Sequence, residues 1–225
     1  NRAAFELGYI SLLDWTPQSA FAEVYINGEY NGTYNITQKV EESNNRLVLG
    51  DTGYLLEIDQ LERLDVDDVY FYTDHFLINI KEPSIDVGSA EYDYVDDLIN
   101  EFETVLHSSQ FKDPILGYAK FIDVNSFIDW YLISEITKNV DSQSFSSIYL
   151  NVMPGEKIKM GPLWDFDLSF GNVDYADSQY AAGFWVKSHP WYARLFQDPD
   201  FVNKINVNLD KKNEAQLVLD LKKEL

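Results

Sequence analysis

The residues best suited to chemistry in this chain are two aspartates, Asp165 and Asp167, within residues 161–172. They alternate with the apolar residues Trp164 and Phe166. In an extended segment successive side chains point to opposite faces, so we expect both carboxylates on one face and the apolar side chains on the other. Two carboxylates this close repel unless a cation lies between them, and carboxylate oxygens suit Mg²⁺, Mn²⁺ and Ca²⁺. The segment therefore predicts a divalent-metal site at Asp165 and Asp167.

A second polar segment holds Asn139 and Asp141. It follows a predicted helix and precedes a predicted hairpin that leads into the acidic segment. Phosphoryl transfer needs a metal clamp on the phosphates, a carboxylate directed at the attacking hydroxyl, and a lysine against phosphate charge. In protein kinases a catalytic loop and a metal-binding Asp flank a hairpin in this same order. The order indicates a phosphoryl-transfer site, although the usual Gly-rich loop and the His-Arg-Asp and Asp-Phe-Gly strings are absent.

The elements that must position these residues follow from periodicity. The first part of the chain alternates like an antiparallel sheet, with a turn at Asn27-Gly28, the strongest short hairpin signal. The strands are expected at 21–26, 34–40, 53–59, 70–72 and 76–81. Helical spacing begins near residue 89, and a second helix over 121–137 is capped by Asp123 or Asn125. The later elements are a hairpin at 146–160, a loop and short helix over 183–201, and a terminal helix in the final Lys-, Glu- and Leu-rich stretch.

The composition excludes several classes of protein. With 225 residues, 45% of them hydrophobic, the chain can bury a sizeable core as one domain. A formal charge of −21 disfavours binding to nucleic acid or anionic lipid. The absence of cysteine excludes disulfides, thiolate nucleophiles and Cys-based zinc sites, and three scattered histidines argue against a histidine-centred hydrolase. No apolar run approaches the ~20 residues of a membrane span, and no signal peptide is visible.

The order of motifs resembles the spore-coat CotH kinase family over nearly the whole chain. The acidic segment ending in Gly-Asn is the most specific match. The other matching segments are 1–7, 25–34, 53–59, 80–83, 133–141 and 191–196. The resemblance implies an α+β, atypical protein-kinase-like fold in a single domain, 1–225. An N-terminal antiparallel β-rich lobe, 1–85, would precede a mainly helical lobe, 86–225, that holds the catalytic loop and the metal motif.

The resemblance also implies an activity. It predicts a kinase that uses ATP and Mg²⁺ or Mn²⁺, with Ca²⁺ as a further candidate, to phosphorylate Ser or Thr of secreted, coat or surface proteins. Asp141 would be the catalytic-loop acid and Asp165 the principal metal ligand, supported by Asn139 or Asp167. The same resemblance, together with the acidic, cysteine-free composition, leads us to expect a bacterial protein at the cell surface, outside the cell or in the spore coat.

Four further residues are candidates for nucleotide binding. Lys81, which ends a predicted strand, is the first choice for the phosphate-contacting lysine, and Lys39 is the second. Glu57 repeats a two-residue carboxylate spacing with Asp59, and could pair with that lysine, extend the metal shell or form a structural ion pair. Tyr54 offers an aromatic face for adenine, or is a core residue of its strand.

Other interpretations of the acids remain open. Phe170 and Ala176 argue against an EF-hand, because that loop requires Gly and Glu at those positions, whereas a different structural calcium site would fit. The family fold could also carry a catalytically silent binding or assembly module, outside the cell or associated with a cellulosome. Gln38 stands where the resemblance leads us to expect an acid, and the absence of that acid favours the catalytically silent module. A glycoside hydrolase is the weakest alternative, because two acids two residues apart cannot flank a sugar ring.

Overall fold

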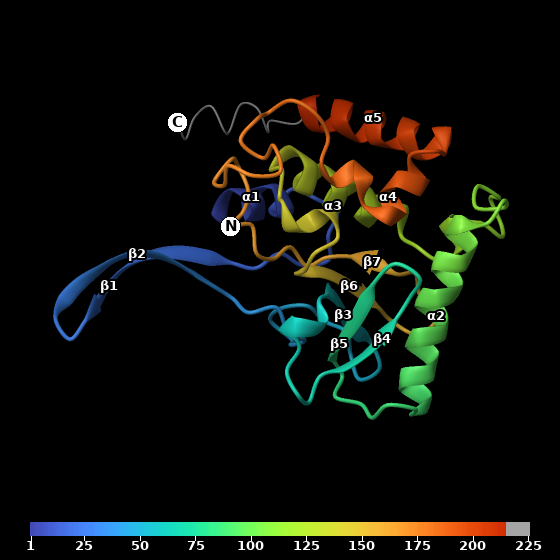
Figure 1. The fold of residues 1–225 in the computed structure, drawn as a ribbon, viewed down its shortest axis with the longest axis horizontal. Helices are drawn as coiled ribbons and strands as arrows, with labels where there is room; N and C mark the ends of the chain where they lie inside the picture. Colours follow the sequence, from blue (N-terminus) through green and yellow to red (C-terminus); the bar gives the residue numbers. More distant parts are fainter. Residues whose placement is uncertain (215–225) are drawn as a thin grey trace.

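The computed structural model describes residues 1–214, in which a long hairpin projects from the body formed by the other elements (Figure 1). A five-stranded antiparallel sheet in the order β4-β5-β3-β6-β7 forms the centre of the body. Its strands are β3 (Tyr54–Asp59), β4 (Val69–Tyr72), β5 (Leu77–Glu82), β6 (Ile148–Val152) and β7 (Lys159–Met160). The strands predicted at 53–59, 70–72 and 76–81 and the hairpin at 146–160 are therefore confirmed.

The projecting hairpin consists of β1 (Ser19–Ile26) and β2 (Glu29–Thr37), which pair with each other in a separate two-stranded sheet. Its turn is the predicted Asn27-Gly28, with φ values of 54° and 89°. Positive φ at both central residues is the requirement of a type I′ turn, which matches the twist of the flanking strands. The predicted hairpin is confirmed, with β2 beginning earlier than expected.

Helices cover the sheet and form the rest of the body. They are α1 (Arg2–Tyr9), α2 (Ala90–His107), α3 (Val124–Ile136), α4 (Pro190–Leu195) and α5 (Pro199–Glu214). Ser89 caps α2 by accepting a hydrogen bond from the Tyr92 N–H, and Asp123 caps α3 by accepting one from the Ser126 N–H. In the described part of the chain no helix is both long and apolar enough to cross a membrane.

One helix was not predicted from the sequence, and the prediction of another lies partly outside the described residues. The sequence pattern missed α1, since the first 85 residues read mainly as strands, and α1 contacts α3 through a buried side that includes Phe5. The sequence predicts a terminal helix in the last residues, and the part of that prediction in 215–225 lies outside the described residues.

The two faces of the central sheet differ: one packs on the main hydrophobic core, and the other carries polar side chains beside a smaller apolar cluster that includes Leu55 and Tyr149. Tyr54, Leu56 and Ile58 on β3 belong to the main hydrophobic core. Because side chains alternate along a strand, the residue between the last two, Glu57, lies on the other face. Its direct partners on the neighbouring strands are Asn79 and Tyr149, so these three polar side chains share that face. The polar face is where the sheet can contribute to a site.

The α+β class predicted from the sequence is confirmed. The pairing of β3 with β6 joins the two halves of the chain, because β3 precedes the expected lobe boundary at residue 85 and β6 follows it. The division into kinase-like lobes stays a prediction.

Candidate functional site

The two predicted polar segments meet in the structure. The Phe170 N–H donates to the Thr137 carbonyl at 2.7 Å, which ties the acidic segment to the end of α3. Asn139 donates from Nδ2 to the main-chain carbonyl of Asp165 at 3.5 Å. Asn139 and Asp165, predicted separately, therefore lie in contact at one place.

The acidic segment is not the extended strand that its alternation predicts. Strand β7 ends at Met160, and the following Gly161 has a φ of 101°. Pro162 has no N–H to donate to a ladder, and Asp165 has a φ of 57°. The segment is thus a loop, in which the left-handed conformation at Asp165 turns the chain. An aspartate in this conformation is uncommon and is held by surrounding contacts, which is typical of functional sites.

The carboxylates are nevertheless brought together. Burial and the charge of Asp167 raise the pKa of Asp165, and the two side chains lie close enough to share a hydrogen bond when one of them is protonated. Burial, followed by the charges of Asp165 and Asp167, raises the pKa of Asp141. Arg63 acts in the opposite direction on Asp165 and Asp141. The three predicted acids therefore form one electrostatic group, with an arginine beside it.

The residues present fit a divalent cation in part. Among the described residues no group of three His, Cys, Asp or Glu side chains is arranged as a complete metal site. However, Asn139 is only 3% exposed, and its Oδ1 is buried without a hydrogen-bond partner. A buried amide oxygen without a donor is costly unless something else satisfies it. Mg²⁺ typically takes one or two carboxylates and fills its remaining positions with water and substrate phosphates, a donor set that Asp165, Asp167 and Asn139 Oδ1 can supply.

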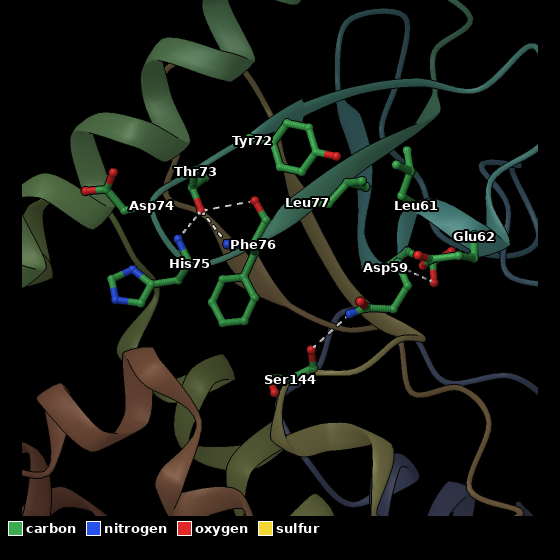
Figure 2. Close-up of a pocket in the computed structure, with 11 residues that line it drawn as sticks. Asp59, Leu61, Glu62, Tyr72, Thr73, Asp74, His75, Phe76, Leu77 and Ser144 are labelled. Carbon is green, nitrogen blue, oxygen red and sulfur yellow. Dashed lines mark hydrogen bonds between the residues drawn. The ribbon is translucent and has the colours of Figure 1, made fainter.

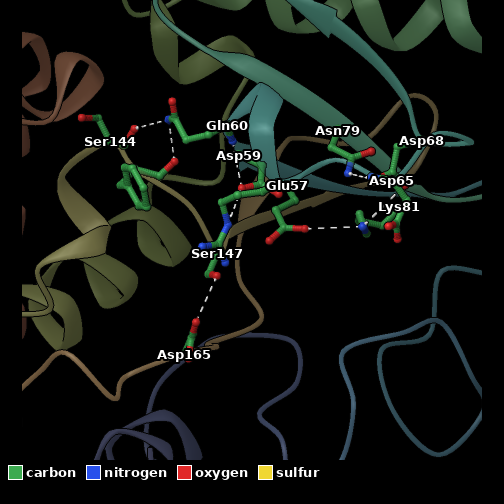
Figure 3. Close-up of polar contacts among 12 residues, drawn as sticks. Glu57, Asp59, Gln60, Asp65, Asp68, Asn79, Lys81, Ser144, Ser147 and Asp165 are labelled. Carbon is green, nitrogen blue, oxygen red and sulfur yellow. Dashed lines mark hydrogen bonds and ion pairs between the residues drawn. The ribbon is translucent and has the colours of Figure 1, made fainter.

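On the sheet, Lys81 forms the predicted pair with Glu57. Its Nζ lies 3.7 Å from Glu57 Oε2 and 3.8 Å from Asp68 Oδ1, so the lysine is shared by two carboxylates (Figure 3). Asp68 also accepts a hydrogen bond from Asn79 Nδ2 at 3.1 Å. Burial, together with the charge of Asp59, raises the pKa of Glu57 to about 7, although Lys81 opposes the shift.

The sheet and the acidic loop belong to one site. The Tyr149 hydroxyl donates a hydrogen bond to Glu57, and the charges of Glu57, Asp59 and Asp165 all act on the pKa of that tyrosine, which burial raises well above its usual range. Ser147 donates from its hydroxyl to Asp165 Oδ2 at 3.4 Å. Figure 3 shows Asp165 and Ser147 beside Glu57 and Asp59. A lysine–glutamate pair thus stands close to the acids of the loop.

The sequence interpretation missed Arg63 and Tyr149. Arg63 Nε lies 3.2 Å from Asp59 Oδ1, and its charge acts on Glu57, Asp141 and Asp165. The four-residue spacing from Asp59 to Arg63 was the available signal. Nothing in the local sequence marks Tyr149, because its partnership with Glu57 comes from the pairing of β3 with β6.

Two predicted nucleotide-binding residues are not brought to this group. Lys39 has a side chain that is 78% exposed and pairs with Glu41 at 3.9 Å. Tyr54 is 3% exposed, lies on the apolar face of the sheet and stacks on Tyr94 with ring centres 5.8 Å apart. Leu56, two residues further along β3, also belongs to the main core, so Tyr54 and Leu56 lie on one face. Glu57 lies on the opposite face, and Tyr54 therefore points away from it.

A cavity of about 350 Å³ adjoins the site at the end of β3 (Figure 2). It shares Asp59 with the electrostatic group and Ser144 with the loop that follows Asp141. Gln60 joins those two walls by donating from Nε2 to the Ser144 carbonyl at 3.4 Å and to the adjacent Phe145 carbonyl at 2.7 Å. The remaining lining includes the β4–β5 turn around His75. The cavity leaves room for part of a ligand next to the acids.

The fold and the site define a class of protein: an α+β protein in which clustered acids lie near a lysine–glutamate pair, residue types that phosphoryl transfer uses. A family model described as CotH kinase protein matches residues 11–218. The chain belongs to the CotH kinase family, as its motifs predicted. Membership in a kinase family implies use of ATP and a divalent metal in general. No curated protein matches the chain in sequence.

Proposed function

We propose that this protein is an ATP- and divalent-metal-dependent Ser/Thr protein kinase of the CotH type. The observation that carries the proposal is the meeting of Asp141, Asp165 and Asp167 with the unsatisfied Oδ1 of Asn139, beside the Lys81–Glu57 pair. Family membership supports the same reaction class. The site residues fit the parts that phosphoryl transfer needs, although none of the three familiar kinase strings is present.

In this proposal each residue has a separate role. A bound Mg²⁺ or Mn²⁺ would neutralise phosphate charge, with Asp165, Asp167 and Asn139 Oδ1 as the residues that hold it. Lys81 contacts the phosphates, and Glu57 orients the lysine. Arg63 adds a second cation beside the acids.

Asp141 accepts the proton in the transfer step. The oxygen of a Ser or Thr hydroxyl forms a bond to the γ-phosphorus of ATP, while the bond from that phosphorus to the β–γ bridging oxygen breaks and ADP leaves. The hydroxyl proton passes to the Asp141 carboxylate. Burial and the charges of Asp165 and Asp167 raise the pKa of Asp141, which makes its carboxylate a stronger base than that of an ordinary aspartate.

The expected acceptor is a secreted, coat or surface protein, and the expected location is the cell surface, the spore coat or the surrounding medium. A formal charge of −21 supports an acceptor that is a protein and not a nucleic acid. Transfer of labelled γ-phosphate to protein tests the reaction, with Asp141→Asn as the matched inactive variant. Metal-dependent transfer that this variant loses would support the proposal, whereas transfer that the variant retains would remove Asp141 from its role.

The alternative is a catalytically silent binding or assembly module on the same fold. Gln38 favours it, since the family resemblance places an acid there, and its Oε1 instead accepts a hydrogen bond from the Gln18 N–H at 2.9 Å. The two functions differ in one measurement: a silent module shows no stabilisation by ATP that depends on Mg²⁺ or Mn²⁺.

A further inference from the structure

The peptide group that joins Asp165 to Phe166 is held at both ends by side-chain amides. Its carbonyl accepts a hydrogen bond from Asn139 Nδ2 at 3.5 Å, and its N–H donates to Asn1 Oδ1 at 2.6 Å. Asn139 is a predicted site residue, whereas the sequence assigns no role to Asn1. The contact with Asn1 joins the start of α1 to the middle of the acidic loop, 165 residues away in the sequence.

The side chain of Asn1 serves the acidic loop and not its own helix. Asn1 occupies the N-cap position of α1, where an asparagine oxygen usually accepts a hydrogen bond from an N–H of the first turn. In the described structure this side chain accepts no such bond from α1. Its Oδ1 accepts from the Phe166 N–H instead. The helix thus forgoes the stabilisation of a capping bond, and the oxygen is directed between the two acids of the loop.

Helix α1 holds Asn1 in a fixed place. The main-chain carbonyl of Asn1 accepts a hydrogen bond from the Phe5 N–H at 3.0 Å, and Phe5 is fully buried in the main core. Further along the helix, a Cβ added at Gly8 would come within 2.8 Å of Leu163 Cδ1. Glycine has no Cβ, which permits this close approach of the helix to the acidic loop. The Oδ1 of Asn1 is therefore presented to the loop from a backbone that is packed against it.

We propose that Asn1 is a positioning residue for the carboxylates of Asp165 and Asp167. This role rests on the proposed function, in which those carboxylates hold the divalent metal. The peptide group between Asp165 and Phe166 fixes the backbone from which the Asp165 side chain extends. Asp165 has a φ of 57°, and an aspartate keeps this left-handed conformation only where its surroundings determine it. Asn1 and Asn139 supply that constraint from the two ends of one peptide group.

The hydrogen bond from Phe166 to Asn1 adds orientation more than attachment. The apolar side chains of the loop already anchor it in the core, since Leu163 is 0% exposed and Phe166 is 3% exposed. Contacts that orient metal ligands without touching the metal usually change metal affinity by about 10–100-fold when they are removed. Loss of the Asn1 side-chain oxygen should therefore affect metal binding while the fold persists.

Hydrogen exchange of the Phe166 amide, followed by NMR in the protein without metal, tests the contact itself. Asn1→Leu keeps the shape of the side chain without an acceptor, and exchange of this amide should become about threefold to tenfold faster than in wild type. Asn1→Asp keeps an acceptor oxygen and should restore the protection. Ser11→Ala is the matched control, because it removes a hydrogen bond of 2.6 Å to the Gly8 carbonyl at the other end of α1. This control should leave the Phe166 amide protected, and equal exchange in wild type and Asn1→Leu would overturn the role of Asn1.

Calorimetric titration with the Mn²⁺ complex of a non-hydrolysable ATP analogue tests the consequence for binding, without a need for phosphate transfer. Asn1→Leu should bind this complex about tenfold or more weakly than wild type, with an unchanged circular dichroism spectrum. Asn1→Asp and Ser11→Ala should bind it at least as tightly as wild type. Equal affinity of Asn1→Leu and wild type would overturn the role of Asn1 and leave the proposed function standing. A wild type that does not bind the complex would contradict the proposed function and this role together, even with a protected Phe166 amide.

Discussion

Asn139 holds the main-chain carbonyl of Asp165 at 3.5 Å with its side-chain nitrogen and keeps its side-chain oxygen buried without a donor. One amide therefore joins the loop after α3 to the acidic loop and leaves a buried acceptor oxygen at the junction. Asp167 and Asp141 complete the group electrostatically. The arrangement explains why these loops carry so much buried polar surface in a protein that could have packed apolar residues there.

Replacing Asp165 should separate stability from ligand binding. Asp165→Asn removes a charge that burial and Asp167 make unfavourable, so the protein without ligand should become more stable. The same variant should lose the thermal stabilisation that Mg²⁺ and ATP give wild type. Asp141→Asn serves as the control, since it should keep that stabilisation and lose phosphate transfer. Equal ligand stabilisation of Asp165→Asn and wild type would exclude Asp165 as a principal ligand.

Lys81→Met should weaken ATP binding by about tenfold or more, because the loss of a charge-assisted phosphate contact costs about 1.5–3 kcal/mol. Lys39→Met is the matched control: its side chain is 78% exposed, and the change should leave affinity and stability within experimental error. Calorimetric titration with ATP and Mg²⁺ measures both variants. If Lys39→Met weakened ATP binding and Lys81→Met did not, the phosphate-contacting lysine would be Lys39.

Glu57 should make the free protein less stable as pH rises. Its pKa is raised from 4.5 to about 7 in the folded protein, so the stabilisation is complete below pH 4.5 and is lost as pH rises through 7. Glu57→Gln mimics the protonated form. The variant should match wild type near pH 4.5 and exceed its free energy of unfolding by about 1–3 kcal/mol at pH 8, as urea denaturation measures. Wild-type stability that is equal to the variant's at both pH values would show that Glu57 is ionised without cost.

His189 should make the protein sensitive to acid. The residue is fully buried at the start of α4, where its Nδ1 accepts a hydrogen bond from the Trp191 N–H at 3.2 Å. Burial lowers its pKa from 6.5 to about 3, so its stabilisation is present above pH 6.5 and is lost as pH falls toward 3. Wild type should lose about 2 kcal/mol at pH 5 through this residue.

The variant His189→Asn isolates that loss, because asparagine can still accept at the helix start but does not titrate in this range. The difference in unfolding free energy between pH 7 and pH 5 should be about 2 kcal/mol smaller in the variant than in wild type. Subtraction of the two profiles removes the contributions of the other titrating groups. Parallel profiles would assign the acid sensitivity to those groups.

Much of the fold could be predicted because it follows from local pattern. The Asn27-Gly28 turn, the caps at Ser89 and Asp123, and the alternation along β3 each specify their element without reference to the rest of the chain. The loop at Asp165 could not be predicted in this way, since alternation of acids with apolar residues reads as a strand. There the chain conformation follows from Gly161 and Pro162 and from contacts with residues far away in sequence.

The site residues that lie in the ordered series of motifs could be predicted from the sequence. Those that reach the site only through the pairing of strands could not. Asp141, Asn139 and Asp165 lie in loops whose order along the chain indicated a shared site. Tyr149 is a partner of Glu57 only because β6 pairs with β3 in one particular register, which no local pattern reveals. The same limit affected Tyr54, whose face of the sheet depends on the core packed against it.

The most direct test of the account is a crystal structure with a non-hydrolysable ATP analogue and Mn²⁺, read from the anomalous signal of the metal. The account predicts a peak within ligand distance of Asp165 and of Asn139 Oδ1, with the phosphates of the analogue reaching toward Lys81. The Asp165→Asn protein under the same conditions should give no peak there. A metal or nucleotide bound away from these residues would contradict the account.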